Sequence, residues 1–249
     1  MQRIVVLSGP SCVGKGPLIH VMRIFYPELM STFKRLVLFN DRAPRPGEEE
    51  GVDYFFRPRG AIEALRGKDG YIVADVRGDL QALEVAQIQR ILNAGQTPFF
   101  EVNPFVPGSL RDAGLCDQFP TVSIFLSPLS REEILSLKSL PISVDLNKFV
   151  ADVQRRKLLH RTTRQKMYLS LRDLENIEKQ CSSALTEMRE AWKFDHVIHL
   201  HDGEGNENWD GFYYPIGSAR KAMLAFASVL RGDENPVGLD APWTEDLIP

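Results

Sequence analysis

The start of the chain combines a short apolar run, a glycine-rich loop and an amphipathic run. Residues 3–7 are rich in β-branched side chains and predict a strand, and residues 18–25 predict a helix. Between them lies the sequence SGPSCVGKG, with glycines at positions 9, 14 and 16. Successive backbone N–H groups of such a loop can point at one phosphate, the helix dipole adds positive charge, and Lys15 can reach the outer phosphates. The stretch therefore predicts a phosphate-binding loop between a strand and a helix.

The residues after Lys15 depart from the usual phosphate-loop pattern. That pattern places Ser or Thr directly after the lysine, where the hydroxyl binds magnesium, whereas this chain has Gly16 and then Pro17. Pro17 suits the first turn of a helix but removes one N–H that could face a phosphate. Taken alone, the stretch also allows the alternative of a glycine loop with an unrelated lysine.

A second stretch, residues 40–56, carries two arginines and a tyrosine in a turn-rich loop. Prolines on both sides hold Arg45 in an extended conformation, Arg42 lies three residues before it, and Tyr54 begins a short predicted strand. Guanidinium groups donate in a planar fork that matches phosphate oxygens, and a phenol hydroxyl adds one more donor. These three side chains can together bind a phosphomonoester. The acidic run at 48–50 favours the alternative of a charged surface loop.

The phosphate loop and the segment RAPRPGEEEGVDYFF, in this order, resemble the guanylate kinase family, whose second motif reads RxPRPGExxGxDYxF. The resemblance covers most of residues 3–200. It implies transfer of a phosphoryl group from ATP to GMP, with ATP and Mg²⁺ as cofactors. It also implies an α/β fold: a P-loop kinase core with a parallel sheet flanked by helices, an inserted acceptor-binding subdomain and a helical lid.

The family's plan divides this chain into a guanylate-kinase-like domain at residues 1–231 and a C-terminal tail at 232–249. Within the domain, the plan implies a core at 1–34, 96–128 and 190–231, an acceptor-binding subdomain at about 35–95 and a lid at about 129–189. The tail is rich in proline and acidic residues and carries Trp243. We expect it to be peripheral, or to dock on a neighbouring subunit.

The resemblance also implies roles for residues that match the family's motifs. The expected catalytic cations are Lys15 and Arg161, the second in a basic run at 155–166 where the family keeps its lid. The residues expected to bind ATP are Gly9, Pro10, Ser11, Cys12, Val13, Gly14, Lys15, Gly16 and Pro17. The residues expected to bind the acceptor are Arg42, Arg45, Tyr54, Glu101 and Asn103. No dedicated metal ligand is expected, and the basic run has the alternative of a solvated helix face or a weak nucleic-acid patch.

Some positions lack the residue that the family has. By spacing from Tyr54, the family's guanine-reading glutamate and its second tyrosine fall near Val73 and Ala82, and Asp75 could substitute only if the loop is shifted. The family's second lid arginine falls at Gln180. These losses predict weak or absent GMP phosphorylation. They leave open a kinase with a different phosphorylated acceptor, and a guanylate-kinase-like binding module that has lost catalysis.

Glu101 and Asn103 stand at the end of a predicted strand, residues 96–103, where the family has two acids that serve the acceptor base and the metal. Glutamate can order a magnesium-bound water, and asparagine contributes a neutral oxygen. Asn103 has the equally weighted alternative of a turn residue before Pro104.

Further elements follow from hydrophobic periodicity. We expect a strand at 33–39, helix-like structure from 57 to 93 including a helix at 80–92, and a closing helix at 219–230. Core strands are expected at 121–128 and 193–200. Ser130 followed by Glu133 predicts a capping box at the start of a helix.

Composition and charge are those of an ordinary globular chain, without the signals of a polyanion-binding, secreted or membrane protein. With 43% hydrophobic residues in 249, the chain is long enough for one core with subdomains, and a net charge of -3 gives no polyanion-binding surface. We therefore expect nucleotide partners, no specific nucleic acid and a possible homo-oligomer. Three cysteines suit a reducing cytoplasm, although Cys12 in the phosphate loop could be oxidised or alkylated. Neither a signal peptide nor a membrane-length apolar run is seen, which predicts a cytoplasmic protein without a membrane partner.

Overall fold

The computed structural model describes residues 3–44, 47–142 and 144–248, so Arg45 lies outside the described residues. The predicted α/β fold is confirmed: a five-stranded sheet has the order β2-β7-β1-β8-β9, and its pairs β2–β7 and β8–β9 are parallel. Its strands are β1 (Ile4–Ser8), β2 (Phe33–Arg35), β7 (Thr97–Val102), β8 (Thr121–Ser127) and β9 (His196–His199). All five residues of β1 are buried, as expected for a parallel strand covered on both faces.

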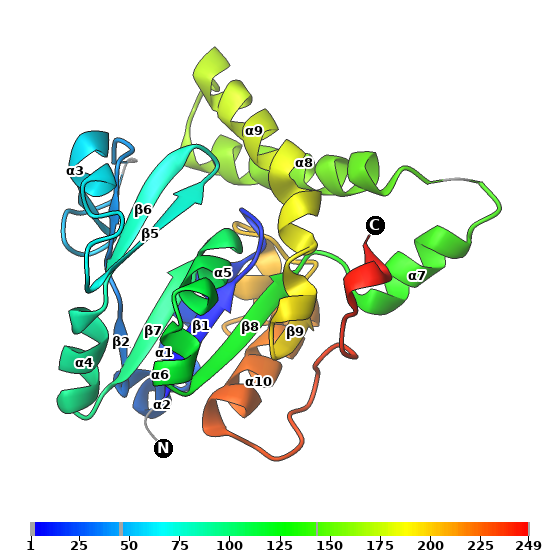
Figure 1. Cartoon of the computed structure of the whole chain (residues 1–249). Coiled ribbons are helices and arrows are strands. Elements are labelled where there is room, and N and C mark those ends of the chain that lie inside the picture. The colour runs from blue at the N-terminus through cyan, green and yellow to red at the C-terminus, as the bar shows by residue number, and fades with distance from the viewer. Residues whose placement is uncertain (1–2, 45–46, 143, 249) are drawn as a thin grey trace. The chain divides into compact units, whose positions relative to one another are not determined.

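The chain divides into two compact units, which are described separately. Unit 1 comprises residues 1–6 and 32–122, and unit 2 comprises residues 7–31 and 123–249. Unit 1 contains a four-stranded sheet with the order β4-β3-β6-β5, visible in Figure 1. Its strands are β3 (Leu38–Asn40), β4 (Tyr54–Phe56), β5 (Tyr71–Val76) and β6 (Asp79–Glu84). The helices of unit 1 are α3 (Arg59–Glu63), α4 (Ala86–Asn93), α5 (Phe105–Asp112) and α6 (Leu115–Gln118).

Strand register sorts the side chains of the four-stranded sheet onto two faces. Asn40 pairs with Phe56 across the parallel β3–β4 ladder and with Gln81 across the antiparallel β3–β6 ladder. Residues that pair directly share a face, and alternate residues along a strand do too. The face that carries Tyr54, here named the Tyr54 face, consists of Leu38, Asn40, Tyr54, Phe56, Ile72, Ala74, Val76, Asp79, Gln81 and Leu83. The opposite face packs on α3 through a cluster of Ile62, Leu80 and Ala82 with Phe39, Leu65 and Val73, and is named the α3 face.

The prediction of helix from residue 57 to 93 is wrong for most of its length. Only α3 and α4 are helical there, and residues 71–84 form the β5–β6 hairpin. The two residues between the strands, Arg77 and Gly78, have φ of 55° and 89°, which is the left-handed pair that a tight hairpin turn requires. The predicted strand at 33–39 is also two strands, because β2 and β3 belong to different sheets.

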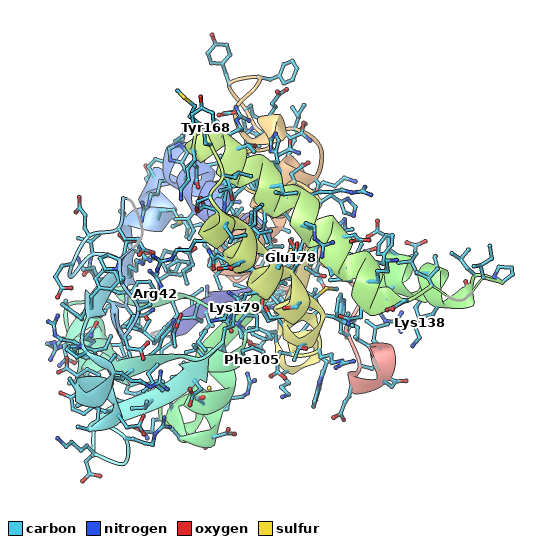
Figure 2. The ribbon with its side chains drawn as sticks, turned by 90° about the horizontal axis from the view of Figure 1, so that it is seen from above. Arg42, Phe105, Lys138, Tyr168, Glu178 and Lys179 are labelled. Carbon is cyan, nitrogen blue, oxygen red and sulfur yellow. The ribbon has the colours of Figure 1, made fainter. Side chains whose placement is uncertain are left out.

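Unit 2 holds the predicted phosphate loop and the remaining helices. They are α1 (Lys15–Phe25), α2 (Pro27–Ser31), α7 (Arg131–Ser139), α8 (Leu146–Gln165), α9 (Leu171–Met188), α10 (Gly217–Arg231) and the short η1 (Ala191–Lys193), η2 (Glu207–Trp209) and η3 (Glu245–Leu247). Helices α8 and α9 form an antiparallel hairpin (Figure 1), and Figure 2 shows Tyr168 at the turn that joins them. The predicted capping box of Ser130 and Glu133 is confirmed at the start of α7.

The tail after residue 231 differs from the peripheral segment that we expected. Trp243, Leu247 and Ile248 are buried. The Lys138 ammonium on α7 donates to the carbonyls of Asp246 and Leu247, at 3.4 and 3.3 Å. The end of the tail therefore packs against α7 within unit 2 (Figure 1).

Candidate functional site

The loop between β1 and α1 has the backbone of a phosphate-binding loop. Gly9 and Gly14 have φ of 145° and 116°, which disfavours any side chain there. A Cβ at Gly9 would stand 2.5 Å from the Leu126 carbonyl oxygen, so the loop also needs glycine for space. The Lys15 ammonium donates to the carbonyls of Gly9 and Pro10, at 2.7 and 3.0 Å. Lys15 thus lies across the loop whose N–H groups are expected to receive phosphate.

The unusual pair after Lys15 fits the helix without strain. Gly14 is the N-cap of α1, so Gly16 and Pro17 are its second and third residues. The first N–H groups of a helix have no partner within the helix, so a proline there breaks no helical hydrogen bond. A Cβ at Gly16 would meet nothing within 4 Å. The missing hydroxyl therefore has open space into which a larger side chain would fit.

Cys12 presents its backbone to the loop but turns its side chain into the protein. The thiol is buried in a cluster with Leu158, Ile177 and Cys181. Burial, followed by the negative charge of Glu204, raises the pKa of the Cys12 thiol to about 11. Because the thiolate is the reactive form, the expectation that Cys12 is open to oxidation or alkylation does not fit this environment.

The segment after β9 supports the phosphate loop from outside. A Cβ at Gly14 would stand 2.7 Å from Leu200 Cδ2 and 2.9 Å from the Asp202 carbonyl oxygen. The Trp209 indole N–H donates to the carbonyls of Asp202 and Gly203, at 3.3 and 3.1 Å. The Asp202 carboxylate accepts from the backbone N–H of Ala219, at 2.8 Å, at the start of α10. Residues 202–209, which sequence motifs did not explain, therefore pack behind the loop and are named the brace.

Part of the basic run on α8 contacts the segment after β9, whereas Arg156 and His160 are exposed. Lys157 donates to the Leu200 carbonyl at 3.2 Å, Arg161 pairs with Glu204 at 2.9 Å, and Arg164 donates to the Gly205 carbonyl. Burial lowers the pKa of Lys157 to about 8. Burial alone would also lower the pKa of Arg161, but the Glu204 carboxylate outweighs it and the pKa rises. These contacts connect α8 to residues 200–205. Arg161, the proposed lid arginine, therefore already has a carboxylate partner.

Gln180, the position that matches the family's second lid arginine, is buried in α9. Its amide donates to the Asn176 carbonyl of the same helix, at 3.2 Å, while its own amide oxygen has no partner among the described residues. The side chain therefore supplies no charge and no exposed donor.

In unit 1, the side chains of Arg42 and Tyr54 lie next to each other. The Arg42 guanidinium stands 5.1 Å from the Tyr54 ring centroid and 5.8 Å from that of Phe56. Its two terminal nitrogens donate to both oxygens of Glu48, at 2.7 and 2.6 Å. Burial is the main cause that raises the pKa of Tyr54, so its hydroxyl stays protonated and can donate. Figure 2 shows Arg42 beside the four-stranded sheet. The third member of the motif, Arg45, lies outside the described residues.

Glu101 and Asn103 differ in their environment. Glu101 lies on β7 and is close enough for its charge to raise the pKa of Tyr54 slightly, after burial and against two arginines. The Asn103 side-chain oxygen accepts from the Phe105 N–H, at 3.1 Å, at the start of α5. The turn interpretation of Asn103 therefore has a structural basis, whereas a role toward the acceptor stays a prediction.

The two positions that spacing matches to the family's guanine-reading glutamate and second tyrosine lie on the face of the sheet opposite Tyr54. Val73 and Ala82 belong to the α3 face, in the cluster around Ile62. Asp75 shares that face and pairs with Arg66, at 3.5 Å, with most of its side chain exposed. It cannot replace a missing group on the Tyr54 face. Sequence reasoning missed the two polar side chains that do lie there, Asn40 and Gln81, because only strand register reveals them.

Comparisons with known proteins agree with this geometry. The family model described as guanylate kinase matches residues 1–140. The guanylate kinase of a Thermus thermophilus strain is 30% identical over 201 residues, which is 79% of this chain and 73% of that protein. The guanylate kinase of a Synechococcus species is 36% identical over 133 residues, 53% of this chain and 58% of that protein. The crystal structure of guanylate kinase from Anaplasma phagocytophilum has a TM-score of 0.52 at 18% identity, and the match covers 96% of this chain and 89% of that one. This chain therefore belongs to the guanylate kinase family.

Proposed function

We propose that this protein transfers the γ-phosphoryl group of ATP to GMP, giving ADP and GDP, at a rate below that of an ordinary family member. The observation that carries the proposal is the retained phosphate loop, with Gly9 and Gly14 in left-handed backbone and Lys15 held across the loop. The pairing of Arg42 with Tyr54 in unit 1 supports an anionic acceptor. Family membership supports the reaction class.

Phosphoryl transfer needs positioning and charge neutralisation rather than a covalent nucleophile. In our proposal, the loop N–H groups and Lys15 hold the ATP phosphates, and Arg161 neutralises charge as the phosphoryl group passes. Arg42, Arg45 and Tyr54 hold the acceptor phosphate. On binding, each cation would leave its present partner and contact a phosphate instead. Lys15 would leave two backbone carbonyls, Arg161 would leave Glu204, and Arg42 would leave Glu48. Each exchange replaces an existing charge-assisted contact, which lowers the net gain on binding.

The chain's own groups fit Mg²⁺ that arrives with ATP. Within the described ranges, no group of three His, Cys, Asp or Glu side chains could hold an ion. Gly16 offers no hydroxyl, and Mg²⁺ usually keeps several waters and takes its other ligands from substrate phosphates. When bound, Mg²⁺ would neutralise phosphate charge. Glu101 is our candidate for ordering one of its waters.

The departures from the family pattern support a low rate. Gly16 lacks a hydroxyl, Pro17 lacks an N–H, and Gln180 lacks a charge. Losing one transition-state donor typically costs on the order of a hundredfold in rate. A protein that retains ATP binding but has lost several such groups should still turn over, slowly.

A coupled assay of ADP formation tests the proposal, with ATP and each of GMP, AMP, CMP, UMP and a sugar phosphate. We expect slow turnover with GMP. ATP binding without turnover of any acceptor would favour the inactive binding module, and turnover of the sugar phosphate alone would favour a kinase with a different acceptor. Lys15→Ala supplies the background.

We also propose nucleotides as the physiological partners, a cytoplasmic location and a possible homo-oligomer. No helix in the described part of the chain combines the length and apolar character needed to cross a bilayer. Cell fractionation and light scattering of the purified chain would test the location and the oligomeric state.

A further inference from the structure

Two amide side chains lie next to each other on the Tyr54 face. Asn40 on β3 pairs in register with Gln81 on the antiparallel β6. Their exposed fractions are 0% and 7%. On the parallel side, Asn40 pairs with Phe56, which stacks near Arg42. The two amides therefore lie in the same sheet and on the same face as Tyr54, which we predict to bind the acceptor phosphate.

These amides have hydrogen-bonding capacity that the protein does not use. The Asn40 side-chain oxygen accepts from the Arg42 backbone N–H at 3.1 Å, but its Nδ2 group has no partner among the described residues. The structure gives the Gln81 amide no hydrogen bond to any described residue. Buried polar groups are nearly always hydrogen-bonded, so the unused, buried Nδ2 group of Asn40, next to the unused amide of Gln81, points to a ligand.

Besides the two amides, the polar side chains of the Tyr54 face are those of Tyr54, assigned to the acceptor phosphate, and Asp79. Leu38, Ala74, Val76 and Leu83 are apolar and buried. Two carboxylates of unit 1 act on Arg42. Glu48 forms an ion pair with it, and the charge of Asp79 also raises the pKa of Arg42. The Asp75 carboxylate lies on the α3 face.

We propose that Asn40 and Gln81 contact the base of the acceptor, and that the acceptors are purine nucleoside monophosphates as a class rather than GMP alone. The inference rests on the proposed function, because it concerns the acceptor side of that reaction. A carboxylate only accepts hydrogen bonds, so it suits the N–H groups of guanine and rejects the acceptor N1 of adenine. An amide both donates and accepts, and a rotation of its terminal group exchanges the two.

Equilibrium binding of GMP, IMP, AMP and CMP to the full chain tests this inference without relying on turnover. We expect dissociation constants for GMP, IMP and AMP within about tenfold of one another, and weaker binding of CMP, whose base has one ring instead of two and reaches less far. Gln81→Glu should raise the preference for GMP over AMP by about tenfold, since a carboxylate favours the guanine edge. Gln81→Leu should weaken all three purines by similar factors. Asp75→Asn, a matched change on the α3 face, should leave the preference unchanged.

Binding of GMP more than about a hundredfold tighter than AMP by the unmodified chain would overturn the inference. So would a preference that Gln81→Glu leaves unchanged while circular dichroism shows a folded variant. The comparison of GMP with AMP uses the unmodified chain, so it does not depend on whether a variant folds. Purine-tolerant binding without phosphoryl transfer would sink the proposed function and leave the inference standing. Strict selection of GMP together with its phosphorylation would support the proposed function and overturn the inference.

Discussion

Trp209 lies directly against Gly14, so that a Cβ added at Gly14 would stand 3.1 Å from Trp209 Cζ2. The ring is buried, and its indole N–H holds the carbonyls of Asp202 and Gly203. The conformation of the residue before Lys15 therefore depends on a tryptophan in a distant part of the chain. The first prediction follows from this contact.

Trp209→Ala should weaken ATP binding by about tenfold or more and leave GMP binding unchanged, because it removes the support of the phosphate loop. Truncating a buried tryptophan also costs about 3–5 kcal/mol of stability. Trp209→Phe keeps most of the ring and should restore much of the ATP affinity. Isothermal titration with each nucleotide measures the effect, and Trp192→Phe, at a half-exposed position, is the control. Equal loss of both nucleotides would mean that Trp209 supports the fold in general.

Binding of the acceptor phosphate should depend on the planar guanidinium of Arg42. Arg42→Lys keeps the charge but loses the fork, and should raise KM for GMP by about tenfold with KM for ATP unchanged. Arg57→Lys is the matched control, because Arg57 pairs with Glu50 beside the same sheet and is more exposed. Steady-state kinetics with each substrate varied in turn supply the comparison. A parallel rise in both KM values would contradict the assignment of Arg42 to the acceptor.

Restoring the missing groups of the phosphate loop should increase ATP affinity. Gly16→Ser adds a hydroxyl directly after Lys15, where the structure has open space. Pro17→Thr restores an N–H and adds a hydroxyl one residue later. We expect each to lower the dissociation constant of ATP with Mg²⁺ by several-fold, which corresponds to about 1 kcal/mol. Titration in EDTA separates the metal-dependent gain. No change from either variant would show that the loop already binds phosphate as well as its geometry allows.

Buried Lys157 should make stability depend on pH. Its pKa falls from 10.5 to about 8 on folding, so between these values the unfolded chain binds more protons at this residue. The free energy of unfolding should therefore rise with pH above about 8. Cys12 acts in the opposite direction, because its pKa rises from 9.0 to about 11, and it lowers stability above about pH 9.

Urea unfolding of the wild type and Lys157→Met at about pH 7.5 and about pH 9 isolates the lysine. Cys12 is present in both proteins, so most of its contribution cancels, and Lys157 is the smallest of the influences on its pKa. The wild type should gain stability relative to the variant as the pH rises. Parallel pH dependence in the two proteins would show that Lys157 is not held in a buried site.

Local signals in the sequence predicted the parts of the site that lie within single segments. The phosphate loop depends on a strand, glycines and a helix that are contiguous, and Arg42 with Tyr54 lies within one motif. The face occupied by Val73 could not be predicted, because it depends on the turn at Arg77 and Gly78 and on pairing with β3. Spacing from Tyr54 alone cannot detect a one-residue shift in strand register, and such a shift moves every side chain to the other face of the sheet.

Contacts between distant segments were beyond the sequence patterns. Arg161 and Glu204 are 43 residues apart, and so are Lys157 and Leu200. No periodicity links such pairs, so the basic run of α8 could equally have been a solvated face. The proline-rich, acidic composition of the tail predicts a peripheral segment. Its packing depends on three apolar side chains near the end, Trp243, Leu247 and Ile248.

The central claim is ATP-dependent phosphoryl transfer to GMP that depends on Lys15. Chromatographic measurement of all four nucleotides over time, with the wild type and Lys15→Ala, tests it most directly. We predict that the wild type forms GDP and ADP in equal amounts, slowly, and that Lys15→Ala forms neither while its circular dichroism spectrum stays native. ADP formation without GDP, or equal GDP formation by the Lys15→Ala variant, would contradict the account.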